Sequence, residues 1–92
     1  MTIYVAVRHG SNSANQSMCN RAVLFLVDAQ DKRVAHSLVM EIETFYNNQR
    51  LELIPQSKAS KADYMEALEG GPWDGPLSCA NVRAIIEKIR CY

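Results

Sequence analysis

The chain has no apolar run long enough to cross a membrane. Its longest run, Ala22 to Val27, has six residues in a sequence of 92, whereas a transmembrane helix needs about 20. The amino terminus lacks the pattern of a secretion signal, because it has no basic start and Arg8 interrupts the apolar stretch after Met1. We therefore expect a protein without a membrane partner.

Closely spaced metal-ligating residues are also absent. The three cysteines, Cys19, Cys79 and Cys91, lie far apart, and neither His9 nor His36 forms a close pair with one of them. Zinc sites usually use short Cys/His spacings, so we expect no metal and no cofactor. An odd number of scattered cysteines without an export signal is typical of free thiols in a reducing cytoplasm.

No charge of one sign dominates the chain. Ten basic residues balance ten acidic ones, so the formal net charge is zero. A dedicated nucleic-acid-binding protein is basic as a whole and a mimic of nucleic acid is strongly acidic, so we expect neither, although local basic clusters remain compatible with a zero total. The apolar share of 48% and the length suit one globular domain over residues 1–92.

Three segments have the patterns of β-strands. Apolar and polar residues alternate from Thr2 to Arg8, which predicts a strand with one buried face. The segment from Arg21 to Asp28 is apolar on both faces and predicts a central strand, with a helix as the alternative. A short strand is predicted from Leu51 to Ile54, ended by Pro55.

Three later segments have helical spacing. The first helix follows Asp31 as its N-cap and carries apolar residues from Ala35 to Tyr46. The second follows Ser60, and the third follows Ser78. We expect Tyr64, Met65 and Leu68 to form the buried stripe of the second helix, and Val82, Ile85, Ile86 and Ile89 that of the third. The predicted fold class is α+β, a small β-β-α-β-α-α domain with three short strands and helices covering one face.

The end of the first strand carries a motif. Arg8-His9-Gly10 is followed by Asn15, seven residues after Arg8. This pattern resembles the histidine phosphatase family, in which Arg-His-Gly ends the first strand and an asparagine lies at that distance. The resemblance implies a nucleophile at His9, with Arg8 and Asn15 holding phosphate.

The rest of the chain departs from that family. The resemblance covers about eight residues, and Ser11 stands where the family usually has an acidic residue. The family also needs a second histidine on a doubly wound sheet of about twice this length or more, whereas His36 falls on the polar side of a predicted helix. We therefore predict that Arg8 and His9 are strand-end residues, and that the chain has no catalytic residues.

Two loops are the candidate contact surfaces. The segment from His9 to Asn20 is rich in polar uncharged residues, and Asn12 and Asn15 are its candidate contacts. The second loop, residues 70–76, is stiffened by prolines and carries Trp73 and Asp74. Trp73 either covers the core between the second and third helices or anchors a partner.

In general character the whole chain resembles the phage-encoded anti-CRISPR inhibitors of type I systems. The shared features are a compact domain, free cysteines and no catalytic signature; no shared motif carries the resemblance. It implies a non-catalytic inhibitor in the host cytoplasm that binds Cas subunits, with guide RNA as a further local contact, and that blocks target DNA binding. The basic candidates for these contacts are Arg33, Arg50, Lys58, Lys61, Arg83 and Arg90.

Two other functions remain open from the sequence. One is a small phosphatase-like or thiol-dependent enzyme that uses His9 or a cysteine. The other is a small nucleic-acid-binding regulator, which a salt-sensitive interaction with bare DNA or RNA would indicate.

Overall fold

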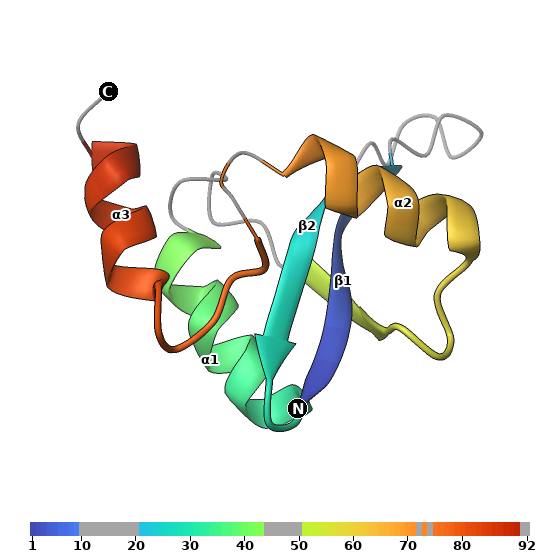
Figure 1. Cartoon of the computed structure of the whole chain (residues 1–92), viewed down its shortest axis with the longest axis horizontal. Helices are drawn as coiled ribbons and strands as arrows, with labels where there is room; N and C mark the ends of the chain where they lie inside the picture. Colours follow the sequence, from blue (N-terminus) through green and yellow to red (C-terminus); the bar gives the residue numbers. More distant parts are fainter. Residues whose placement is uncertain (10–20, 44–50, 72, 74, 91–92) are drawn as a thin grey trace, which may run out of the picture.

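Six elements follow one another in the order β-β-α-β-α-α in the computed structural model of the chain (Figure 1). The structure describes residues 1–9, 21–43, 51–71, 73 and 75–90. The strands and helices are β1 (Thr2–His9), β2 (Arg21–Ala29), α1 (Lys32–Glu43), β3 (Leu51–Pro55), α2 (Lys61–Gly70) and α3 (Val82–Arg90). The predicted α+β class and element order are confirmed, and the segment from Arg21 to Asp28 is a strand.

β1 is the central strand of a three-stranded antiparallel sheet with the order β2-β1-β3. It pairs with β2 along its whole length, with an irregularity between Ala6 and Val7, and with β3 from Tyr4 to Arg8. The prediction that the segment from Arg21 to Asp28 is the central strand is therefore wrong. This strand is apolar on both faces because both faces of the sheet are covered by helices.

The outer edge of β2 is partly closed by the segment between α2 and α3. Leu77 forms a parallel bridge with Val27. The Leu77 N–H donates to the carbonyl oxygen of Leu26 at 2.8 Å, and the Leu77 carbonyl oxygen accepts from the N–H of Asp28 at 2.7 Å. Because an unpaired edge strand leaves its backbone groups open to other chains, this short bridge protects β2 at the point where the chain passes from α2 to α3.

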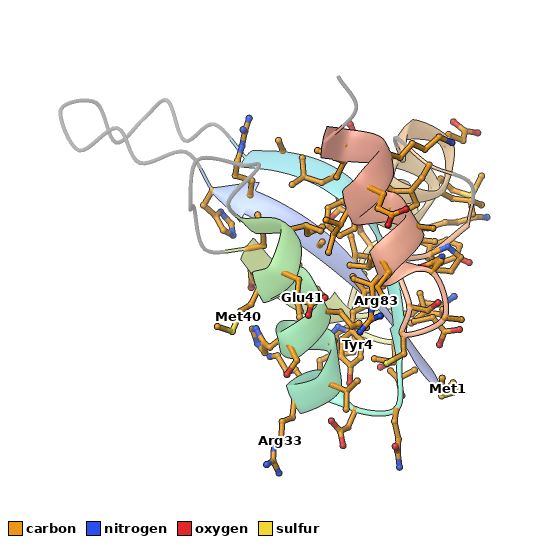
Figure 2. The ribbon with its side chains drawn as sticks, turned by 90° about the vertical axis from the view of Figure 1, so that its left-hand side faces the viewer. Met1, Tyr4, Arg33, Met40, Glu41 and Arg83 are labelled. Atoms are coloured by element: carbon orange, nitrogen blue, oxygen red, sulfur yellow. The ribbon has the colours of Figure 1, made fainter. Side chains whose placement is uncertain are left out.

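Both faces of the sheet bury apolar side chains. Alternate residues of a strand point to opposite faces, so β1 places Tyr4 and Ala6 on one face and Val5 and Val7 on the other. α1 and α3 pack on the first face, whereas α2 packs on the second through Ala67. In Figure 2, α1 and α3 lie nearest the viewer and α2 lies behind the sheet. The expectation that the helices cover one face is therefore wrong, because β1 is apolar on both faces and each face needs a cover.

Two of the three helices begin at the N-cap residue that the sequence predicts. The Asp31 Oδ1 accepts from the N–H of Val34 at 3.0 Å, and the Ser60 Oγ accepts from the N–H of Asp63 at 3.1 Å. Before α3 the Ser78 side chain is not the cap. There Asn81 stabilises the turn: its Oδ1 accepts from the Ser78 N–H, and its Nδ2 donates to the Pro76 carbonyl oxygen, both at 2.8 Å. Tyr46, the last apolar residue predicted for the first helix, lies outside the described residues.

Candidate functional site

The outer face of α2 exposes two large apolar side chains. Met65 and Leu68 are three residues apart, so they are neighbours on the helix surface, and they are 40% and 53% exposed. The residue that α2 buries is Ala67, which is 2% exposed, with the half-buried Tyr64 packed against the same cluster. The predicted buried stripe is therefore wrong for Met65 and Leu68.

Met65 and Leu68 are exposed because α2 contacts the sheet through the small side chain of Ala67. A helix that packs through an alanine approaches the strands closely, and its larger side chains then point away from them. The apolar residues Tyr64, Met65, Ala67 and Leu68 spread over about half of the helix circumference, so their spacing alone does not select which of them is buried. This apolar side is too broad for one contact with the sheet, and its width is the signal in the sequence that could have indicated an apolar surface on α2.

A small pocket adjoins Leu68 at the end of α2. Its lining residues are Phe25, Leu26, Ala67, Leu68, Gly71, Trp73 and Gly75. Its volume is about 30 Å³, which accommodates the end of one side chain, whereas drug-sized ligands occupy pockets of about 300–1,000 Å³. Gly75 has a φ of 76°, a left-handed conformation that glycine adopts readily, so the turn at this wall depends on that residue.

Trp73 packs on the core and lines this pocket. Its ring centroid lies 4.9 Å from that of Phe25, with an angle of 48° between the ring planes, and tilted pairs of this kind are favourable. This placement corresponds to the first of the two alternatives, in which Trp73 covers the core. The indole Nε1 is buried and has no hydrogen-bond partner in the described part of the chain, so aromatic packing is the contact that positions the ring.

Acidic residues outnumber basic ones on α2, and one of them, Glu69, lies beside Met65 on the helix surface. The helix contains one lysine, Lys61, against three acidic residues, Asp63, Glu66 and Glu69, which leaves a formal charge of −2. Its last turn has no basic residue, and the carboxyl end of a helix is the negative end of its dipole. Along α2, the electrostatic potential is therefore most negative toward Leu68 and the pocket.

His9 contacts a carboxylate at the far end of the sheet. Its Nε2 lies 2.5 Å from Oε1 of Glu52 on β3, and the two side chains are 45% and 51% exposed. Because β1 continues through His9, Arg8 and His9 point to opposite faces of the sheet. Their placement does not favour joint binding of one phosphate group, as the histidine phosphatase pattern would require.

The basic candidates do not form one patch. The exposed ones are Arg33 in the first turn of α1, Lys58 before α2, Lys61 at its first residue, and Arg83 on α3. Figure 2 shows Arg33 and Arg83 on different helices and well apart. Within the described ranges, none of these four side chains forms an ion pair with a carboxylate.

The remaining predicted site residues are not described. Asn12, Asn15, Arg50, Asp74 and the side chain of Arg90 lie outside the described part of the structure.

Three further properties of the described residues concern metal binding, free thiols and membrane-spanning helices. Among them, no group of three or more histidine, cysteine, aspartate or glutamate residues is arranged to hold a metal ion. Cys79 is exposed and free, whereas Cys19 and Cys91 lie outside the described part. No helix in the described ranges combines the length and apolar character that spanning a bilayer requires.

Comparison with known proteins adds no relative. No protein-family model, no curated protein and no solved structure matches the chain. The class of protein is therefore defined by the fold and its surface alone. It is a small α+β domain with helices on both faces of an antiparallel sheet and an exposed apolar surface on α2.

Proposed function

We propose that this chain is a non-catalytic protein-binding module that occupies a surface of a larger partner. The observation that carries the proposal is the exposed pair Met65 and Leu68 beside the pocket walled by Trp73. Apolar residues exposed singly are ordinary, but neighbouring apolar side chains around a pocket with a polar rim are typical of protein contacts. Binding of this kind depends on a few anchor residues more than on total area.

The resemblance in general character to anti-CRISPR proteins names the partner to test first. It is a type I CRISPR surveillance complex in the cytoplasm of the host, and occupation of a Cas subunit would block the binding of target DNA. Arg33, Lys58, Lys61 and Arg83 are exposed and available for local contacts with guide RNA or acidic subunits. In this proposal the chain acts as a stoichiometric inhibitor.

The test is a titration of a purified type I complex with the protein, with target DNA binding measured by fluorescence anisotropy. We expect co-elution with the complex and inhibition that is complete at a fixed molar ratio, independent of incubation time. Leu68→Gln should weaken inhibition, whereas Met40→Gln, at an exposed apolar residue on α1, should not. Absence of both co-elution and inhibition at excess protein would exclude this partner.

The same titration separates the binding module from an enzyme. An enzyme would inhibit at a small fraction of the complex concentration, and the inhibition would increase with time. His9→Ala should inhibit as the wild-type chain does, because the proposed function does not use that side chain. Time-dependent inhibition that His9→Ala abolishes would favour the enzymatic alternative.

A further inference from the structure

We propose that the α2 surface, defined as Met65, Leu68 and the pocket walled by Trp73, binds a basic amphipathic helix of the partner protein. One aliphatic side chain of that helix enters the pocket. The inference rests on the proposed function and adds the chemistry of the partner.

The shape of the α2 surface indicates an aliphatic anchor. Leu68 belongs both to the exposed face of α2 and to the lining of the pocket, so the face and the pocket are continuous. Met65 lies one turn away on the same side of the helix. α2 has ten residues and is about 15 Å long, which matches about three turns of a partner helix laid beside it with one side chain in the pocket.

The charge beside the α2 surface selects a basic partner. Glu69 is exposed four residues after Met65, so these two side chains are neighbours on the helix surface, and the negative end of the helix dipole lies at the pocket. Lys61 is at the opposite end of α2. Lysine and arginine residues flanking the aliphatic anchor would lie opposite Glu69 and the carboxyl end of α2. The same charges would repel the phosphates of a nucleic acid, so the occupant of this surface is protein.

The experiment uses two synthetic helical peptides of about 18 residues, long enough to be partly helical in water. Both have one leucine-rich face. The first carries lysines beside that face and the second carries glutamates. Binding to the full chain is followed by the emission of Trp73, the single tryptophan, and by the shifts of backbone amide resonances.

We expect the basic peptide to bind with 1:1 saturation and to shift resonances of α2 and of residues 71–77. Leu68→Gln should weaken binding at least about tenfold, as truncation of an interface anchor does. Glu69→Gln should weaken binding and reduce its dependence on salt, whereas Glu66→Gln, on the other side of α2 from Leu68, should have a smaller effect. Met40→Gln is the matched control and should leave binding unchanged.

Several results would overturn the inference. They are equal binding of the acidic peptide, no saturation up to about 1 mM basic peptide, resonance shifts away from α2, and an RNA oligonucleotide that binds α2 in place of the peptide. If the peptide fails while Leu68→Gln still abolishes inhibition of the complex, the partner chemistry is wrong and the proposed function stands. If the peptide binds at α2 but the chain does not inhibit the complex, the inference stands and the named partner is wrong.

Discussion

Two neighbouring residues of α2, Ala67 and Leu68, should respond in opposite ways to the same substitution. Ala67 is 2% exposed and packs against the sheet, whereas Leu68 is 53% exposed. The spacing of apolar residues predicts the reverse, with Leu68 buried. Replacing each residue in turn by glutamine therefore tests which face α2 turns to the sheet. Intrinsic helix propensities of alanine, leucine and glutamine differ by only a few tenths of a kcal/mol, so the helix itself is little affected.

The expected magnitudes differ clearly. Ala67→Gln forces a larger side chain into a packed site, which costs about 1–3 kcal/mol, and buries an amide without a partner, which costs about 1–3 kcal/mol more. Full burial of a leucine contributes about 1.5–3 kcal/mol. Leu68 is about half buried and glutamine retains two aliphatic carbons, Cβ and Cγ, so Leu68→Gln should cost about 1 kcal/mol or less.

Urea unfolding followed by far-UV circular dichroism measures both free energies of unfolding. A domain of this length has a total stability of roughly 5–14 kcal/mol, and each kcal/mol shifts its Tm by roughly 4–8 °C. Ala67→Gln should therefore lower the Tm by more than about 8 °C, and Leu68→Gln by less than that. A larger loss for Leu68→Gln than for Ala67→Gln would refute the placement of α2 and remove the α2 surface as a docking site.

Three further predictions concern local structure. Ser60→Ala removes the N-cap of α2 and should cost about 1 kcal/mol in urea unfolding, whereas Ser57→Ala, at an exposed turn residue, should cost much less. Gly75→Ala places a side chain at a φ of 76° and should destabilise by about 1–2 kcal/mol. Gly70→Ala meets no atom within 4 Å at a helical position, so it should stabilise by about 0.4–1 kcal/mol; equal effects of the two glycine variants in thermal unfolding would contradict the assigned backbone. Trp73 fluorescence should be blue-shifted and protected from iodide in the free chain, because the ring packs on the core; emission at the wavelength of free tryptophan would show that the ring projects into solvent.

Local sequence patterns predict the strands and helices, because each pattern depends only on residues that are close in the sequence. The alternation in β1 and the caps at Asp31 and Ser60 depend on spacings of two or three positions, and the structure has them within a residue or two of the predicted bounds. The prediction failed at the Ser78 cap, where Asn81 competes for the same turn with two hydrogen bonds of its side chain.

The sequence predicts less of the candidate site than of the secondary structure. The sequence indicates Trp73 as a candidate, and its contact with the core is one of the two alternatives that the sequence allows. The helical spacing of Met65 and Leu68 predicts that they are buried, because large apolar residues at such spacing usually are. Nothing local indicates that the smaller Ala67 would take the contact with the sheet.

The sequence by itself determined the class of the fold, the order of its elements and the positions where two helices begin. Only the tertiary structure decided that β1 is the central strand, that α2 covers the opposite face from α1 and α3, and that Leu68 stands outside the core. These features depend on how distant segments share a limited buried volume. A small side chain at Ala67 brings α2 close to Val5 and Leu26, and the larger side chains of the same helix are then left for solvent or a partner.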